Sequence, residues 1–446
     1  MSFVWTILIV SIVLSSLPSS LSSDVIPFRI QFDRNSFTYL KDRVNVTRWP
    51  DELGSSYAVQ RNDWKYGIPL NVIQSLAQYL TDKFDWEATI EKLNEMPQYK
   101  VRIDNYDVHF VHKRSKNPDA RALMVIHGWP GSFWECHKIL PMLTEPENYG
   151  GSPSDAFHVV CPSIPGYGYS SRPTTDGFDQ QAAAELFAQL MEVLGYKQYF
   201  LQGGDWGSVV ASLQASLPES QNCVMGLHLN MLPVPPPLNK GIVTLLRLAF
   251  SAIVPWWFYT PSERVGIVNT PLHILDHSGY FHEQTTRPQT LAYGLTDSPV
   301  GLLAWIAEKF HAWSDCDGDL FSVFSMDDLL TNFMIYWSTD TSASSIRFYY
   351  EFIRGSYGAF ERLSKLEVKV PTAMSVFPKE IFTPVKFWAE QYYSDLRQWT
   401  VMPRGGHFAA LEQPELLVRD IWSFKRIVES STPHHSDSSH SRSEEM

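Results

Sequence analysis

Cysteine and basic residues are both in short supply in this chain. It has four cysteines in 446 residues and no C-x-x-C pair. So few cysteines do not build a disulfide framework, and we expect buried thiols at Cys136, Cys161, Cys223 and Cys316. Lysine and arginine number 36 against 48 acidic residues, giving a net charge of −12. An acidic chain of this kind argues against nucleic acid as a partner.

Long apolar runs and cofactor motifs are missing as well. Beyond the N-terminus no stretch is apolar enough to span a membrane, and the sequence has no internal repeat. It contains neither H-E-x-x-H nor a glycine-rich loop that would cradle a phosphate. We therefore expect neither a metal nor an organic cofactor.

The N-terminus carries an apolar run, Phe3–Leu14, followed by a serine-rich stretch, as in a signal peptide. The run is short for a bilayer span, although Leu17 and Leu21 extend it toward a marginal anchor. We therefore predict a signal or membrane-anchor segment over residues 1–23. Asn45-Val46-Thr47 is a glycosylation sequon if that part is lumenal. We expect the endoplasmic reticulum membrane, with membrane association through the N-terminus, or a secreted or lumenal protein if the segment is cleaved.

Aromatic and apolar residues are plentiful, at 14% and 44% of the chain, with 15 tryptophans. This composition is typical of a globular protein with a large core, and it also suits an apolar small-molecule pocket. Composition and patterning divide the chain after the N-terminal segment. The expected units are a wrapping region (24–115), a first core part (116–231), a helical cap (232–366), a second core part (367–428) and a disordered tail (429–446).

Strands and helices alternate from residue 122 onward. Short apolar strands separated by amphipathic helices predict an α/β fold with a mostly parallel sheet covered on both faces. The expected strands are 122–126, 157–161, 199–201, 224–229, 372–376 and 398–402. Helices are expected at 69–83, 86–94, 133–143 and 180–194, and a strand pair at 101–112. In such sheets the functional residues follow the carboxyl ends of the strands.

The central motif is Gln202-Gly-Gly-Asp205-Trp-Gly207, between an expected strand and an expected helix. Gly203 and Gly207 flank Asp205 as small residues flank the nucleophile in a nucleophile elbow, with aspartate where esterases have serine. Such a turn exposes the central side chain at a helix N-terminus, which favours a carboxylate. Taken alone, Asp205 would be interpreted as a helix N-cap.

Two further motifs follow expected strands and supply the rest of a catalytic group. His127-Gly-Trp-Pro-Gly-Ser predicts an oxyanion hole made by the backbone N–H groups of Trp129 and Trp206. Arg404-Gly-Gly-His407 places a histidine on a turn after the last strand, as a general base. The orienting acid should follow the preceding strand, where Glu380 fits. Glu367 and Asp395 are weaker candidates, because neither follows a strand end.

An aspartate nucleophile defines the reaction class. A carboxylate attacks saturated carbon and forms an alkyl ester, and water activated by His407 then hydrolyses that ester. Epoxides and alkyl halides both fit. An epoxide leaves as an alkoxide and needs a proton donor, for which tyrosine is suited, whereas a halide needs none. The expected cap contains many tyrosines, and composition alone does not choose among them.

Several motifs together resemble the microsomal-type epoxide hydrolases, a group that includes juvenile hormone epoxide hydrolases. They are His127–Phe133, Gly203–Ser208, Asp297–Leu302, Arg404–Ala410 and Trp64–Gly67, and the resemblance extends from about Pro27 to Val428. It implies an α/β-hydrolase core, a helical cap and an N-terminal segment that wraps over both.

The resemblance also implies roles for individual residues. Asp205 would be the nucleophile, His407 the base and Glu380 the acid. Tyr280 and Tyr349 would be the proton donors to the epoxide oxygen, with neighbouring Tyr350 as an alternative to Tyr349. The expected activity is hydrolysis of lipophilic epoxides to vicinal diols, with the epoxide and water as small-molecule partners. A haloalkane dehalogenase and an inactive carrier of lipophilic epoxides are the alternatives.

Overall fold

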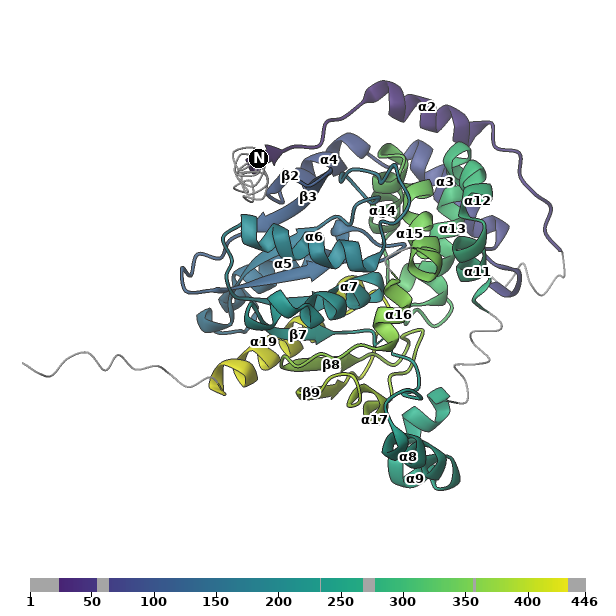
Figure 1. Cartoon of the computed structure of the whole chain (residues 1–446). Helices are drawn as coiled ribbons and strands as arrows, with labels where there is room; N and C mark the ends of the chain where they lie inside the picture. The colour runs from purple at the N-terminus through teal and green to yellow at the C-terminus, as the bar shows by residue number, and fades with distance from the viewer. Residues whose placement is uncertain (1–23, 54–63, 233, 268–276, 356–357, 432–446) are drawn as a thin grey trace, which may run out of the picture.

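The computed structural model describes residues 24–53, 64–232, 234–267, 277–355 and 358–431 (Figure 1). The predicted signal or anchor segment and most of the predicted disordered tail lie outside these residues. The part of that tail that is described continues a helix, α19, to Ser430. No helix within the described ranges is long and apolar enough to cross a membrane.

The described strands form one nine-stranded sheet in the order β1-β2-β3-β5-β4-β6-β7-β8-β9. From β5 to β9 the neighbouring strands are parallel, whereas β1, β2 and β3 are added antiparallel. The expected α/β fold with a mostly parallel sheet is confirmed. The bounds are β1 (Ile26–Phe28), β2 (Gln98–Ile103), β3 (Tyr106–Lys113), β4 (Arg121–Ile126), β5 (Phe157–Pro162), β6 (Tyr199–Gly203), β7 (Val224–Leu229), β8 (Thr372–Val376) and β9 (Leu396–Val401).

The central strands are apolar along nearly their whole length because helices cover the sheet. In β4 and β6 every residue is buried except Arg121 at the start of β4. Helices α6 and α7 pack on each other, and α5 packs against α19. These helices span α5 (Cys136–Thr144), α6 (Gln180–Val193), α7 (Asp205–Ser216) and α19 (Pro414–Ser430). The short helix α17 (Lys386–Ala389) lies between β8 and β9, and the short helix α18 (Ala409–Glu412) follows β9.

The helices inserted between β7 and β8 fall into two groups (Figure 1). The larger group packs together beside the carboxyl ends of the central strands. It comprises α11 (Gly279–Thr286), α12 (Pro288–Asp297), α13 (Pro299–Ala312), α14 (Met326–Ser338), α15 (Ser342–Arg354) and α16 (Ala359–Ser364). The smaller group, α8 (Ile242–Ile253) and α9 (Pro255–Phe258), projects from the molecule beside α17. The insertion is therefore helical, as predicted, but it does not form one compact layer.

The N-terminal helices α2 (Arg34–Asn45), α3 (Leu70–Asp82) and α4 (Trp86–Asn94) lie at the edge of this larger group. Arg43 of α2 forms an ion pair of 2.8 Å with Asp297 and also donates to its carbonyl oxygen. The hydroxyl of Tyr79 in α3 donates to Asp327, at 3.1 Å. The predicted strand pair near residue 105 instead extends the core sheet as β2 and β3.

The prediction of buried thiols at all four cysteines holds only for Cys316, because two of the others form a disulfide and Cys223 is half-buried. Cys136 and Cys161 form a disulfide that joins the start of α5 to β5, with their Cα atoms 6.7 Å apart. Cys223 and Cys316 remain free. The spacing of cysteines in the sequence carries no sign of this pair, because the two residues meet only once α5 packs on β5.

Candidate active site

Asp205 occupies the strand-to-helix turn that the sequence predicts. β6 ends at Gly203, and Asp205 is the first residue of α7, so Gly204 and not Asp205 is the N-cap. Asp205 has a φ of 45°, a left-handed conformation that side-chain-bearing residues seldom adopt and that costs roughly 1–3 kcal/mol. A Cβ added at Gly203 would lie 2.3 Å from the Gly207 carbonyl oxygen, so the turn requires glycine there.

The carboxylate of Asp205 is held against the loop that follows β4. The backbone N–H of Trp129 donates to Oδ1 at 2.7 Å. A Cβ at Gly128 would lie 2.1 Å from the same oxygen, so glycine is required for this approach. Trp206 follows in the first turn of α7, where backbone N–H groups have no partner within the helix. Oδ1 therefore lies at the position where the sequence predicts an oxyanion hole.

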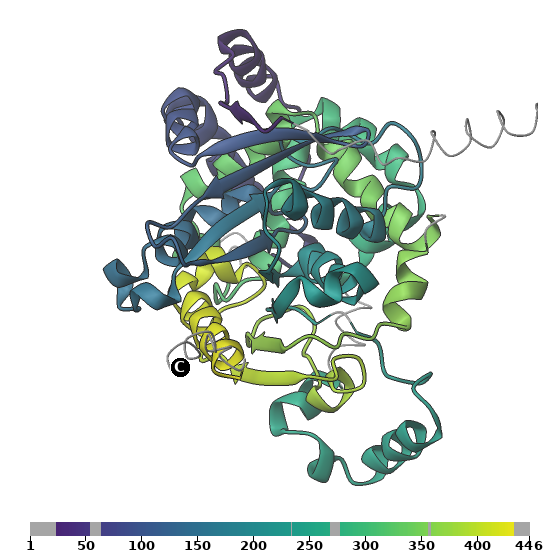
Figure 2. The same ribbon diagram turned by 60° about the vertical axis from the view of Figure 1, so that its left-hand side comes forward.

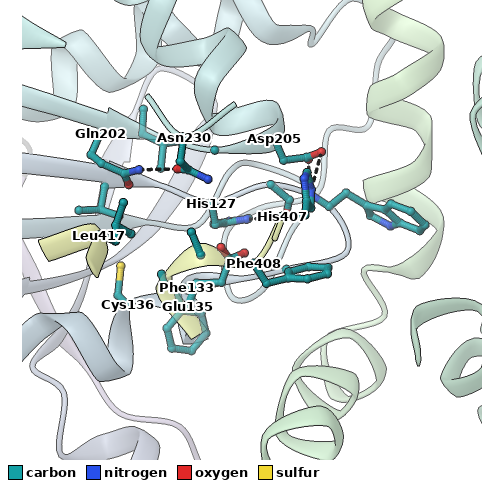
Figure 3. Close-up of a pocket in the computed structure, with 18 residues that line it drawn as sticks. His127, Phe133, Glu135, Cys136, Gln202, Asp205, Asn230, His407, Phe408 and Leu417 are labelled. Carbon is teal, nitrogen blue, oxygen red and sulfur yellow. Dashed lines mark hydrogen bonds and ion pairs between the residues drawn. The ribbon is translucent and has the colours of Figure 1, made fainter. Parts of the chain in front are cut away.

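His407 joins Asp205 to Glu380, and Figure 3 shows its contact with Asp205. Its Nε2 lies 3.3 Å from Oδ2 of Asp205, and its Nδ1 donates to Oε1 of Glu380 at 2.6 Å. The side chains of His407 and Glu380 are 2% and 1% exposed, so water does not compete for this hydrogen bond. The weaker candidates lie elsewhere: Asp395 pairs with Arg397, and Glu367 is exposed.

The electrostatics of His407 depend on its two carboxylate neighbours. Burial lowers the pKa of His407, but the negative charges of Glu380 and Asp205 outweigh burial and raise it well above its usual value. Loss of the charge on Asp205 would lower the pKa of His407 and so favour its neutral form, which is the form that can accept a proton.

Residues from the end of α13 hold the loop that carries His407. The backbone N–H of His407 donates to the Trp313 carbonyl oxygen at 2.8 Å, and that of Gly405 donates to Asp315 at 2.9 Å. A Cβ at Gly406 would lie 2.5 Å from the same Trp313 oxygen. The inserted helices therefore position the histidine as well as flanking the site.

A carboxyl group that the sequence analysis missed faces the same site. Glu135, in the 3₁₀ turn before α5, lines a cavity of about 20 Å³ together with His127, Asp205 and His407 (Figure 3). That volume holds about one water molecule. Burial raises the pKa of Glu135 to about 8, with His407 lowering it in part and Asp205 raising it. A Cβ at Gly131 would clash with the carboxyl oxygen of Glu135. In the sequence, Gly131 was therefore the one residue that could have indicated a close contact with Glu135.

Asp205 also lines a second, larger cavity of about 530 Å³. Its lining is almost wholly apolar or aromatic, with Trp206, Phe281, Phe352 and Trp388 among the contributing side chains. Asp205 is its only lining residue with a charged side chain within the described part of the chain. The cavity falls in the size range of small-molecule sites, and its chemistry favours an uncharged, lipophilic ligand.

Tyr280 of α11 and Tyr349 of α15 both line this larger cavity. Their ring centroids are 6.0 Å apart, and Trp129 packs against both rings. Neither hydroxyl forms a hydrogen bond with another residue among those described. Burial raises the pKa of both phenols, and the charge of Asp205 raises it further, so both stay protonated. Tyr350, the alternative, is 37% exposed and is not among the lining residues, whereas Tyr349 is 2% exposed.

Comparisons with known proteins define the class. Residues 121–418 match the family model of the alpha/beta hydrolase fold, and residues 25–136 match the model of the epoxide hydrolase N terminus. A putative epoxide hydrolase of Stigmatella aurantiaca is 40% identical, covering 89% of this chain and 84% of its own. Epoxide hydrolase 1 of Oryctolagus cuniculus is 38% identical, covering 90% and 89%.

A solved structure agrees with these sequence matches. The crystal structure of juvenile hormone epoxide hydrolase from Bombyx mori superposes with a TM-score of 0.81 at 30% identity, covering 92% of this chain and 96% of that one. The chain therefore belongs to the epoxide hydrolase family of the α/β-hydrolase fold, as the motifs predicted.

Proposed function

We propose that this enzyme hydrolyses lipophilic epoxides to vicinal diols through an ester on Asp205. The observation that carries the proposal is the position of the Asp205 carboxylate. His407 lies 3.3 Å from this carboxylate, which also lines the larger apolar cavity. Tyr280 and Tyr349 line the same cavity. A nucleophile, a base and acids for the leaving oxygen thus meet at one point.

In the first step Oδ2 of Asp205 attacks an epoxide carbon. Oδ1 accepts the hydrogen bond of 2.7 Å from the Trp129 N–H, whereas Oδ2 has the longer contact of 3.3 Å with His407, so Oδ2 is the attacking atom. The carbon–oxygen bond of the ring breaks, and its oxygen takes a proton from Tyr280 or Tyr349. Burial and the charge of Asp205 raise the pKa of both phenols and keep them protonated, so they can donate hydrogen bonds to the ring oxygen before the attack.

In the second step water attacks the carbonyl carbon of the ester. His407 accepts a proton from that water, and Glu380 stabilises the resulting imidazolium. The developing oxyanion is Oδ1, which already accepts the Trp129 N–H, and the Trp206 N–H would be the second donor. The cavity of about 20 Å³ beside His407 has room for the attacking water, and Glu135 would orient it. Collapse of the intermediate breaks the bond between Cγ and Oδ2, and the departing alkoxide takes the proton from His407 to complete the diol. The second proton of the attacking water returns to the tyrosine that donated in the first step, which leaves Asp205 as a carboxylate.

Mass spectrometry of the His407→Gln variant tests this proposal. The variant should form the ester but hydrolyse it slowly, so the peptide containing Asp205 should gain the mass of the epoxide. An Asp205→Asn variant is the control and should gain no mass. Normal steady-state turnover by His407→Gln would contradict the mechanism.

Halide release from a haloalkane, with no diol from any epoxide, would instead favour the dehalogenase alternative. Binding of an epoxide without an adduct would favour a carrier.

We also propose that the N-terminal segment directs the chain to the endoplasmic reticulum. The sequon residue Asn45 is exposed at the end of α2, and Cys136–Cys161 is a disulfide of the kind that persists in oxidising compartments. Sensitivity of the expressed protein to a glycosidase would support a lumenal catalytic domain. Unmodified Asn45 and reduced cysteines in cells would contradict a lumenal domain, and recovery of the chain in the soluble cytosolic fraction would contradict direction to the endoplasmic reticulum.

A further inference from the structure

Helix α8 is amphipathic in the reverse sense of a normal surface helix. Its polar residues Thr244 and Ser251 face the protein and are 6% and 1% exposed. Thr244 donates to the Gln391 side chain at 3.0 Å, and Ser251 lies 2.6 Å from the hydroxyl of Tyr259. With half-buried Leu248 they form the inward stripe, at the spacing of one helix face.

The outward face of α8 and the following turn are apolar. The exposed large side chains, with their exposed fractions, are Ile242 (69%), Val243 (67%), Leu245 (38%), Leu246 (64%), Phe250 (46%), Ile253 (71%), Trp256 (61%) and Trp257 (73%). We call these residues the α8–α9 surface. Arg247 is the only charged residue from Ile242 to Trp257, and its guanidinium lies over the Phe387 ring, 4.7 Å from the centroid. A continuous apolar surface of this kind indicates a binding partner.

We propose that the α8–α9 surface inserts into the outer layer of a lipid bilayer. Two adjacent exposed tryptophans at one end of an apolar helix are typical of residues that settle at the boundary between headgroups and acyl chains. No acidic side chain lies between Ile242 and Trp257 to oppose an anionic headgroup. The helix also projects away from the rest of the molecule, so a flat surface can reach it (Figures 1 and 2).

The same helices adjoin the larger cavity. Leu248 and Phe258 pack in one apolar cluster with Ile267, Val385 and Trp388. The last three residues also line the cavity of about 530 Å³ that contains Asp205. A lipophilic epoxide dissolved in the bilayer would therefore meet the apolar wall of the cavity close to where α8 and α9 insert. This part of the inference rests on the proposed function.

The described chain begins on the far side of the molecule from α8 (Figures 1 and 2). The proposed contact is therefore separate from membrane association through the N-terminal segment, which the sequence predicts. A test must distinguish the two, and fluorescence from a single labelled position does so because it reports on the surroundings of that position alone.

The experiment uses the full chain with Cys223→Ser and a single new cysteine carrying an environment-sensitive fluorophore. Leu246→Cys reports on the α8–α9 surface, and Tyr293→Cys, an isolated exposed position on α12 at 71%, is the matched control. The probe is a phosphatidylcholine–phosphatidylserine vesicle with a nitroxide quencher on the acyl chains. We expect strong quenching at 246 and none at 293. Equal, weak quenching at both positions would overturn the proposal.

The alternative occupant is a second copy of this chain. In that case the label at 246 would be shielded without lipid, in a manner that depends on protein concentration, and vesicles would not quench it. This outcome would also overturn the proposal.

A second measurement ties the surface to substrate delivery. The Leu246→Glu, Ile253→Glu variant should lose activity several-fold on an epoxide dissolved in vesicles and keep its activity on a small, water-soluble epoxide. Equal activity of variant and parent on the vesicle-borne epoxide would count against delivery through this surface. Absence of diol from the parent enzyme in both assays would instead count against the proposed function, whatever the quenching shows.

Discussion

At the scale of single residues, the site is built from groups that are each unfavourable without the others. Asp205 has a strained backbone, and its carboxylate shares a small space with Glu380 and Glu135. The charges of Glu380 and Asp205 raise the pKa of His407, so its positive form is favoured between them, and burial raises the pKa of Glu135 to about 8, which favours its neutral form. The arrangement accommodates a group that loses its charge during the reaction, as Asp205 does when it becomes an ester.

Replacing both tyrosines tests their role as acids. The Tyr280→Phe, Tyr349→Phe enzyme should lose roughly 10²–10⁴-fold in kcat on epoxides, the usual contribution of a general acid. Each ring still packs against Trp129, so the fold should be retained. Tyr350→Phe is the matched control and should leave kcat within about twofold, because Tyr350 is exposed. An unchanged kcat in the double variant would remove both tyrosines from the mechanism.

Glu135 predicts a specific dependence of stability on pH. Its folded pKa of about 8 exceeds the unfolded value of 4.5, so the folded state binds the extra proton between these values. The free energy of unfolding should therefore fall as pH rises from about 5 to 8, by at most about 4 kcal/mol. Glu135→Gln should flatten this decline in urea unfolding curves, whereas the exposed control Glu147→Gln should not. An identical decline in Glu135→Gln would show that another group causes it.

At the scale of secondary-structure elements, the site depends on a contact between the inserted helices and the turn after β9. Trp313 accepts the His407 N–H, and Gly406 lies against the same carbonyl oxygen. The histidine is therefore placed by a segment that lies far from it in the sequence.

Gly406→Ala should disturb this contact. The added Cβ would lie 2.5 Å from the Trp313 oxygen, so the turn must shift and carry His407 away from Asp205. We expect kcat to fall by at least about tenfold, since misplacements near 1 Å have large effects on rate. Gly294→Ala in α12 is the control, because its Cβ meets nothing within 4 Å, and it should retain full activity. Wild-type kcat in Gly406→Ala would show that the contact does not position the base.

The elements themselves follow closely from local patterns. Helix α4 has the predicted bounds, and β4 to β9 agree within a few residues, because apolar runs and cap residues are local signals.

Asp205, Glu380 and His407 could be located because each follows a strand in a fixed chain order. Glu135 could not, since its importance comes from burial against Gly131 and His407. The exposed apolar face of α8 was also missed, because an apolar helix in a sequence is indistinguishable from a buried one.

At the scale of the whole molecule, a disulfide joins a helix to the sheet beneath the site. Cys136 follows Glu135 directly, so the disulfide constrains the segment that carries this carboxyl group. Replacing both cysteines with serine should lower the free energy of unfolding by about 3 kcal/mol, the usual effect of closing a loop of this length. Urea unfolding under oxidising conditions measures the difference. Cys223→Ser, at a free and half-buried position, is the control and should have little effect.

The central claim is that Asp205 attacks the epoxide and water attacks only the ester. A single turnover with excess enzyme in ¹⁸O-labelled water, using a lipophilic epoxide such as styrene oxide, tests it most directly. The account predicts a first diol with no label, because its new oxygen comes from Oδ2 of Asp205, and label in the Asp205 carboxylate afterwards. A labelled diol in the first turnover would mean that water opens the ring directly, and Asp205 would then not be the nucleophile.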